Sequence, residues 1–326
     1  MFYYGRIRND GDKIIMRFLY LQDTHIKGIN PCNRKGDYYQ DIMSKIKETI
    51  SLSEKLEVDY VIHGGDLYDS PNVSNLMVDE LVDLIEKAKI QWYILPGTHD
   101  EIGHNWELSK GVSLAHIFRR SKLITELIAL PNKNAYVIQG FRYYHNCEQD
   151  IKTNGLKCQY PNAKFRIAVT HAFITLKPFL PQVMHVVAKD IKTDFNVVLV
   201  AHYHAQWGIK DIGGVKYVSL GCFGRTSIDE VGIKPTVALI DTSTQEIKLI
   251  PLKNAKMGSE VFNLEGVEKM KNFEGEIDKF IKSLDSTKFQ ALDIKGLVEH
   301  LSKENNVEKE VKDCVIERIG GFENEE

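Results

Sequence analysis

Short apolar runs alternate with amphipathic stretches through roughly the first hundred positions. The runs at residues 14–21, 58–62 and 90–95 are rich in β-branched and aromatic residues, which is typical of buried strands. Between them, residues 39–56 and 75–89 carry apolar positions at helical spacing with charges in the gaps, which predicts two helices. This β-α-β-α-β order predicts a layered α/β core whose first three strands share a direction.

The pattern is weaker from residue 101 to 164. Residues 124–130 and 135–140 are typical of strands or short helical pieces, and residues 143–161 are polar and irregular. Apolar runs return further along the chain, first at residues 165–170 and 197–200. We interpret the four runs that follow as a meander of strands, at residues 207–212, 215–220, 236–240 and 246–252. The Gly213-Gly214 pair predicts a hairpin between two of these runs.

The residue composition of the chain changes after about residue 253. Lys and Glu become dense there, and residues 267–285 and 295–313 show helical periods. We therefore expect a main domain at residues 1–252 and a small C-terminal α/β cap or partner-docking region at residues 253–326. Residues 1–13 are expected to be peripheral.

Composition restricts the class of protein without identifying it. The chain has 326 residues and a formal net charge of −3, so any nucleic-acid contact must rest on local basic patches. No apolar run reaches the roughly 18 residues of a membrane span, so we expect no membrane partner. The charged N-terminus is unlike a signal peptide, and the five cysteines include no Cys-x-x-Cys pair. We expect reduced thiols and a cytoplasmic location.

Histidine and aspartate side chains collect where five of the predicted strands end. These residues are Asp23, His25, Asp66, His99, His171, His202 and His204. Alternate residues of an extended segment share one face, so the Asp-x-His and His-x-His pairs each offer two groups on one side. Imidazole and carboxylate together suit divalent ions, and the lack of cysteines here argues against a closed structural zinc site. Seven groups exceed the needs of one four-coordinate ion, so we predict two ions that share Asp66.

Each group has an ordinary structural explanation when it is taken alone. A single Asp after a strand is usually a turn former or helix cap, and a single His is more often hydrogen-bonded structure than a ligand. The coincidence at five strand ends favours a metal centre. The remaining histidines fall outside the pattern, and we interpret them as structural or surface residues: His63, His104, His116, His145, His185 and His300.

The ordered motifs resemble those of the calcineurin-like metallophosphoesterases. Those motifs are D-x-H, G-D-x-x-D, G-N-H-D/E, H and G-H-x-H, and this chain carries counterparts of all five between residues 23 and 204. Within the superfamily, the segment around Gly65-Asp66 resembles the nuclease subunit of the SbcCD-type double-strand-break repair complex. Residues 219–227 more loosely resemble the Pro-Gly-Ser-x-x-Arg segment of that branch. The resemblance implies a layered β-sandwich core flanked by helices.

The resemblance also implies roles for individual residues. Metal one would be bound by Asp23, His25, Asp66 and His204, and metal two by Asp66, Thr98, His171 and His202. The two divalent ions, which we expect to be Mn²⁺, would activate water and clamp the phosphate oxygens. The family pattern makes His99 a phosphate contact or proton donor, Asp100 the residue that orients its ring, and Asp69 a supporting group.

Two positions depart from the family pattern. Thr98 stands where the family has an Asn that supplies an amide oxygen to metal two, and a Thr hydroxyl is a shorter and poorer neutral ligand. Ala201 replaces a Gly, which mainly restricts the backbone. We therefore expect an active enzyme that requires high Mn²⁺, with a weakened second site as the consequence of Thr98.

Three functions stay open at this point. The first is a Mn-dependent DNA exo/endonuclease subunit that acts on ends or hairpins beside an SMC-like ATPase of the SbcC type, with a docking helix at residues 296–319. The second is a phosphoesterase for a small substrate, and the third is a non-catalytic DNA-end-binding subunit with a decayed site. Homodimer formation is also open. Tyr143, Tyr144 and Trp106 offer stacking surfaces for unpaired bases, although buried packing is the commoner fate of such rings.

Overall fold

The computed structural model describes residues 8–10, 13–132, 135–180 and 182–264. The chain divides into two units, 1–263 and 264–326, and only Leu264 of the second lies within the described residues. The predicted helices at 267–285 and 295–313 and the predicted docking helix at 296–319 lie outside the described residues. The proposed boundary at residue 252 stays a prediction. No helix in the described ranges is long and apolar enough to cross a membrane.

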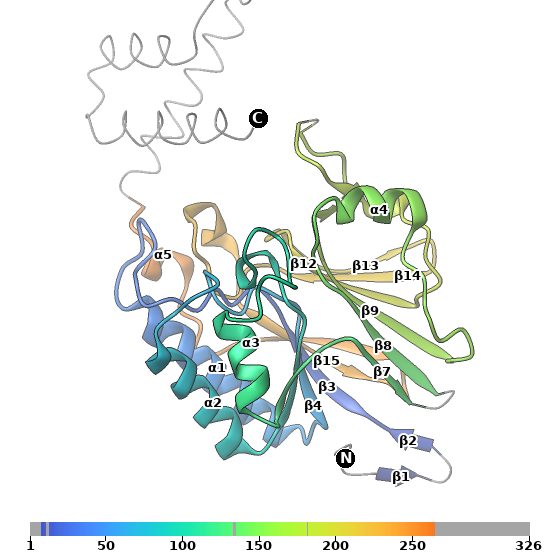
Figure 1. Ribbon diagram of the computed structural model, residues 1–326, viewed down its shortest axis with the longest axis horizontal. Coiled ribbons are helices and arrows are strands. Elements are labelled where there is room, and N and C mark those ends of the chain that lie inside the picture. Colours follow the sequence, from blue (N-terminus) through green and yellow to red (C-terminus); the bar gives the residue numbers. More distant parts are fainter. Residues whose placement is uncertain (1–7, 11–12, 133–134, 181, 265–326) are drawn as a thin grey trace, which may run out of the picture. The chain divides into compact units, whose positions relative to one another are not determined.

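Two six-stranded sheets form the centre of the first unit (Figure 1). One sheet has the order β16 (Glu246–Pro251), β15 (Thr236–Asp241), β3 (Arg17–Leu21), β4 (Tyr60–His63), β5 (Gln91–Ile94) and β6 (Ile124–Glu126). The other has the order β13 (Gln206–Ile212), β14 (Val215–Leu220), β12 (Val197–His202), β9 (Phe165–Ala172), β8 (Tyr136–Phe141) and β7 (Ala129–Asn132). The strands β3 to β6 are parallel, as are β8, β9, β12 and β14.

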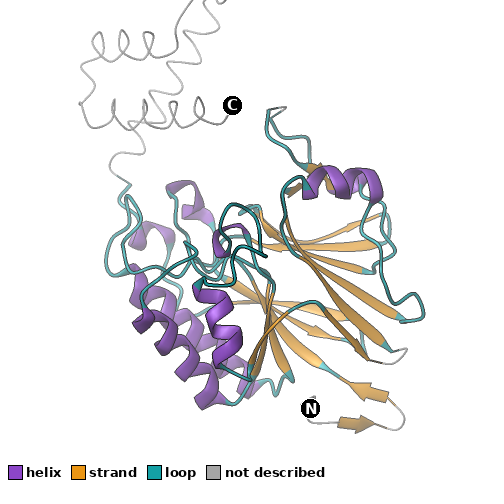
Figure 2. Ribbon diagram, viewed as in Figure 1, coloured by secondary structure: helices purple, strands orange, loops and turns teal. Residues whose placement is uncertain are grey.

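Helices cover the outer faces of the sheets (Figure 2). The helices α1 (Tyr38–Lys55), α2 (Asn75–Ala88) and α3 (Ser113–Arg120) pack on the first sheet, and α4 (Cys147–Asn154) packs on the second. Strand β3 shows how the sequence builds these layers. Phe18 and Tyr20 enter the core between the sheets, whereas Leu19 and Leu21 enter the core under α1 and α2. The predicted layered α/β sandwich flanked by helices is confirmed.

Short elements complete the described part. The strands β1 (Arg8–Asp10) and β2 (Lys13–Ile15) pair with each other, as do β10 (Ile174–Thr175) and β11 (Val186–Val187). Four further short helices are η1 (Thr98–Asp100), η2 (Ala188–Asp190), η3 (Ile228–Gly232) and α5 (Gly258–Val261). The hairpin at Gly213-Gly214 is confirmed, and both glycines have the positive φ of a primed turn, at 62° and 85°.

Three details of the predicted topology are wrong. The last four strands are not one meander, because β13 and β14 form a hairpin in one sheet while β15 and β16 form a hairpin in the other. The expected strand at 14–21 is interrupted at Met16, where the chain passes from β2 into β3. The polar region at 143–161 contains α4, which buries Cys147 and Ile151 on the outer face of the second sheet.

Candidate metal centre

The predicted ligands lie together where strands of both sheets end. Asp23, His25 and Asp66 follow β3 and β4, and the 3-10 helix η1 follows β5. The second sheet contributes His171 near the end of β9, with His202 and His204 at and after the end of β12. Among the described residues, four sets have donor atoms within 4.8 Å of one another: Asp23, His25 and Asp66; Asp66, His171 and His202; His25, Asp69 and His99; and His25, His204 and Cys222. The carboxylate of Asp66 belongs to two of these sets.

Asp66 is the most heavily contacted carboxylate of the centre. It is buried, and it accepts a hydrogen bond from the backbone N–H of His99 at 2.8 Å. Its Oδ2 lies 3.2 Å from His171 Nε2 and 3.8 Å from His25 Nε2. Burial opposes ionisation, but these imidazoles hold the pKa of Asp66 well below its ordinary value. Asp66 therefore presents an anion between the two groups of histidines.

The backbone at the centre adopts conformations that side-chain-bearing residues rarely take. Asp23, His25, Asp66 and His202 have positive φ values of 48°, 46°, 54° and 81°. Backbone hydrogen bonds hold this conformation, with Asp23 N–H donating to Gly65 O at 3.1 Å and His25 N–H donating to Asp66 O at 3.0 Å. Such φ values at non-glycine residues cost about 1–3 kcal/mol each and gather at functional sites. The fold therefore tolerates a destabilising backbone conformation at these residues, and this conformation directs their side chains toward the centre.

Gly65 shows how tightly the loops approach. Its φ is +114°, and a Cβ at this position would lie 2.3 Å from His171 Nδ1. The same His171 atom is 3.0 Å from Gly64 O, so in the neutral ring it donates its proton to that carbonyl and leaves the Nε2 lone pair for a metal ion. Only glycine permits this approach of β9 to the loop after β4.

The side chains on the metal-one side fit a cation. The Nε2 atoms of His25 and His204 face each other at 3.1 Å, and a positive ion or proton must separate their lone pairs. The other ring nitrogen of His204 contacts the buried carboxylate of Glu230, which also accepts from Ser227 N–H at 3.1 Å. Although burial disfavours the imidazolium, Cys222 and Glu230 raise the pKa of His204 above its ordinary value. The donor set and its electrostatics both favour positive charge at this point.

The metal-two side combines His171, His202, Asp66 and Thr98. Burial opposes protonation of His171, but Asp66 raises its pKa to about 9, whereas burial and the neighbouring His171 lower the pKa of His202 to about 3. The Thr98 hydroxyl lies 3.3 Å from both oxygens of Asp66 and 3.5 Å from His202 Nδ1. The hydroxyl therefore lies within reach of the other donors of this set.

Asp100 does not orient the ring of His99, and that prediction is wrong. Its buried carboxylate accepts from the backbone N–H groups of Gly97, Leu67 and Tyr68 at 3.0, 3.2 and 3.1 Å. Burial and the charge of Asp66 raise the pKa of Asp100 to about 7. Asp100 thus ties the loop after β5 to the loop after β4.

The ring of His99 is held instead by a backbone carbonyl. Its Nδ1 donates to Asp69 O at 2.8 Å, and the residue is exposed. The Asp69 carboxylate lies 3.4 Å from His25 Nδ1 and 2.9 Å from Lys27 Nζ. Asp69 therefore supports both imidazoles, His99 through its backbone and His25 through its side chain.

Sequence reasoning missed two groups at the centre. Glu230 contacts the His204 ring. The Ser227-x-x-Glu230 spacing is that of a helix capping box, and it could have indicated from the sequence that Glu230 is held in this loop. Cys222 is buried, and its Sγ accepts from Arg225 N–H at 3.1 Å. Its place beside His25 and His204 depends on the loop after β14. The resemblance at residues 219–227 marked this loop but gave Cys222 no role. The prediction that His63 is structural is confirmed, because its ring accepts from Gly65 N–H at 3.1 Å and contacts Thr24 Oγ1 at 3.0 Å.

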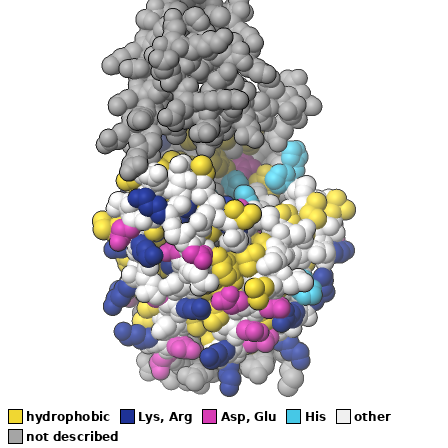
Figure 3. Space-filling model, turned by 90° about the vertical axis from the view of Figure 1, so that its left-hand side faces the viewer, with side chains coloured by type: hydrophobic (Ala, Val, Ile, Leu, Met, Phe, Trp, Pro, Cys, Tyr) yellow, Lys and Arg dark blue, Asp and Glu magenta, His cyan; other side chains and the backbone are white. Residues whose placement is uncertain are grey.

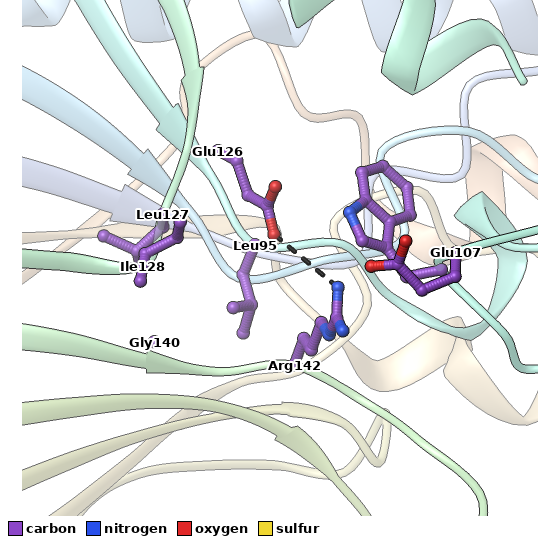
Figure 4. Close-up of a pocket in the computed structure, with 8 residues that line it drawn as sticks. Leu95, Glu107, Glu126, Leu127, Ile128, Gly140 and Arg142 are labelled. Atoms are coloured by element: carbon purple, nitrogen blue, oxygen red, sulfur yellow. Dashed lines mark ion pairs between the residues drawn. The ribbon is translucent and has the colours of Figure 1, made fainter. Parts of the chain in front are cut away.

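One face of the described surface is mixed in charge. Figure 3 shows histidine side chains near the upper end of this face and another lower on its right edge, with basic and acidic side chains interspersed between. A cavity of about 390 Å³ lies beside the loop after β5 and is lined by Trp106, Glu107, Glu126 and Arg142 among others (Figure 4). The Glu126 and Arg142 side chains approach to 3.9 Å within it. None of the predicted ligands lines this cavity.

Comparisons with known proteins identify a family and named relatives. The calcineurin-like phosphoesterase family matches residues 16–206. The chain is 26% identical over 241 residues to "DNA double-strand break repair protein Mre11" of Methanococcus maripaludis and 24% identical over 217 residues to the protein of that name from Saccharolobus solfataricus. These matches cover 66% and 62% of this chain, but only 59% and 53% of those relatives.

The solved structures to which the chain is similar are more distant in sequence. TT1561 of Thermus thermophilus is 14% identical, with a TM-score of 0.45 over 73% of this chain and 99% of that one. The calcineurin-like phosphoesterase YfkN of Bacillus subtilis is 12% identical, with a TM-score of 0.43 over 82% and 99%. Because the family match covers more than half of the sequence and includes every predicted ligand, the chain belongs to the calcineurin-like phosphoesterase family.

Proposed function

We propose that this chain is a metal-dependent nuclease that hydrolyses phosphodiester bonds of DNA as the nuclease subunit of an SbcCD-type complex. The observation that carries the proposal is the pair of donor sets that share the buried carboxylate of Asp66. A two-ion site of this kind suits phosphoester hydrolysis. DNA as the substrate is supported by the relatives named for double-strand-break repair and by the motif resemblance.

The residues fit two divalent ions in the arrangement inferred from the sequence. Asp23, His25, Asp66 and His204 would hold one ion, and Asp66, Thr98, His171 and His202 would hold the other. When bound, the ions supply Lewis-acid activation of water and neutralise charge on the phosphate. A ligand set of carboxylates and imidazoles is compatible with Mn²⁺, which we propose as the working ion.

The chain's own residues then position the substrate. His99 is exposed and its Nδ1 donates to Asp69 O, so its Nε2 is left available to a phosphate or a leaving oxygen. Asp69 orients His99 through its carbonyl, and Asp100 holds the loop after β5 against the loop after β4. His99 is the proposed catalytic residue, and Asp69 and Asp100 are positioning residues.

We also propose that Thr98 permits catalysis. The contacts of its hydroxyl with both Asp66 and His202 support a weakened second site more than a lost one. A non-catalytic DNA-end-binding subunit is therefore less well supported than the enzyme.

The test incubates the full chain with Mn²⁺ and, separately, linear duplex DNA, hairpin DNA and bis-p-nitrophenyl phosphate. We expect DNA cleavage that is lost in Asp66→Ala and His99→Ala and retained in Asp229→Asn, a change at an exposed carboxylate next to the centre. Hydrolysis of the small ester alone would replace the nuclease with a small-substrate phosphoesterase. DNA binding without turnover of any substrate would support the decayed site.

The proposed ATPase partner requires a separate experiment. We propose that the region at residues 292–326 docks onto the ATPase. Co-purification of the two proteins should be lost when these residues are deleted, while the metal content of the remaining chain stays at the level of the full protein. An unchanged pull-down would contradict the docking assignment.

A further inference from the structure

A row of aromatic side chains leads away from the metal-two side of the centre. Tyr143 and Phe173 contact the ring of His202, with centroids 5.6 and 5.9 Å away. Phe173 then contacts Tyr203 at 4.6 Å and Phe179 at 5.3 Å. These rings come from three separated segments of the chain, so the row is built by the fold.

The outer rings of this row are not part of a hydrophobic core. Phe173, Phe179 and Tyr203 belong to none of the three buried clusters of the described residues. Phe179 is 39% exposed, and Phe173 and Tyr203 are half-buried. Their ring contacts are made with one another, with His185 and Trp207, and with His202. Core packing therefore does not account for this part of the row.

Strand pairing and a histidine hold the segment that carries Phe179. The strands β10 and β11 pair on either side of it. His185 bridges the segment, because its Nε2 accepts from Phe179 N–H at 3.0 Å and its Nδ1 donates to Val183 O at 2.7 Å. The neighbouring Leu180 and Met184 are 58% and 52% exposed. The segment holds apolar side chains in solvent beside a hydrolytic centre, an arrangement that is unfavourable without a ligand.

We propose that Phe173, Phe179 and Tyr203 form a stacking site for unpaired nucleobases. This inference rests on the proposed function and names the form of DNA that the same site takes. Because the row contacts His202, a base stacked on Phe173 or Tyr203 would carry its own phosphodiester next to the metal centre. Bases within a duplex are already stacked on each other, so frayed ends and hairpin loops are the DNA forms that use such a site.

Nucleic acid fits this surface better than a protein partner does. Every base has a face that can stack, so a row of rings binds single strands with little sequence preference. A protein partner would have no need for the row to reach a metal ligand, whereas a substrate strand must do so. The row therefore binds the unpaired strand from which the scissile phosphate enters the centre.

Binding of short fluorescent single strands, measured by anisotropy with EDTA present, tests the stacking site without hydrolysis. An oligothymidine is compared with an abasic strand of equal length and charge, so that backbone attraction is the same for both. The full chain should bind the oligothymidine more tightly, and Phe179→Ala or Tyr203→Leu should weaken that binding by roughly 5- to 150-fold, the loss expected for one stacked base. Tyr203→Phe, which keeps the ring, should bind as the unaltered chain does.

Ile128→Ala is the matched control, because Ile128 is 68% exposed and lies outside the row. Thermal unfolding followed by circular dichroism confirms that each variant is folded. Equal binding of the two strands would overturn the stacking site, whether or not the chain cleaves DNA. Base-dependent binding without any DNA cleavage would retain the stacking site and refute the nuclease. Variants that lose only a protein partner would assign the row to protein docking and overturn the proposal.

Discussion

Glu230 offers the sharpest test of how metal one is held. Its buried carboxylate contacts His204 Nδ1 and accepts from Thr226 and Ser227 N–H groups in the capping box of η3. In Glu230→Gln an amide oxygen can still accept from those backbone groups, so the loop after β14 should keep its conformation. What the variant loses is the negative charge that makes the His204 ring a better donor.

The expected cost follows from that loss. Removal of a carboxylate behind a metal-bound imidazole typically weakens metal binding by 10- to 100-fold, or about 1.4–2.7 kcal/mol. Only one ion should be affected, because Glu230 contacts His204 and neither of the histidines proposed for metal two. Titration calorimetry with Mn²⁺ should therefore find one site weakened and the other at its original affinity.

Asp229→Asn is the control for this experiment. Asp229 is the adjacent carboxylate and is exposed, so its replacement changes the charge of the chain equally without touching His204. Two sites of unchanged affinity in Glu230→Gln would refute the reasoning, as would an equal loss at both sites.

Three further predictions concern the second ion, the loops and the pH dependence of folding. Thr98→Asn should bind the second ion roughly tenfold more tightly, as measured by calorimetry. No gain in metal content would contradict the inference that Thr98 limits this site. Gly65→Ala should lower the free energy of unfolding in urea by about 2–6 kcal/mol through its positive φ and the clash with His171, whereas Gly103→Ala, with positive φ but open space, should cost roughly 1 kcal/mol. Burial lowers the pKa of Lys45 from its ordinary 10.5 to about 8. Between these pH values the folded chain binds fewer protons than the unfolded chain, so its free energy of unfolding should rise with pH. Lys45→Met should lack this part of the rise, and identical profiles of unfolding free energy against pH for the two chains would contradict the prediction.

The strand-and-helix frame could be predicted because hydrophobic periodicity reports it directly. The strands β3, β4 and β5 and the helices α1 and α2 have strong local patterns, and parallel strands bring their carboxyl ends to one edge. Asp66 and its partners could therefore be brought together from the sequence. The assignment of the two late hairpins to different sheets depends on long-range pairing, which no local pattern carries.

Other features of the centre needed the structure because they arise from contacts between distant segments. The left-handed backbone at Asp23 and His202 is imposed by neighbouring loops, and neither residue type demands it. Asp100 faces three backbone N–H groups and not the His99 ring, a choice that depends on where Leu67 and Tyr68 pass. Motif resemblance can thus locate a residue at a site and still misassign what its side chain contacts.

The number of ions that the chain binds decides whether Asp66 is shared between two metal sites. Metal-free full chain, equilibrated with Mn²⁺ and analysed for bound metal, should hold two ions per chain, because two donor sets share the carboxylate of Asp66. Asp66→Ala should fall below one ion per chain at the same free Mn²⁺, while Asp229→Asn should hold two. One ion or none in the unaltered chain, or two ions retained in Asp66→Ala, would contradict the shared-carboxylate centre.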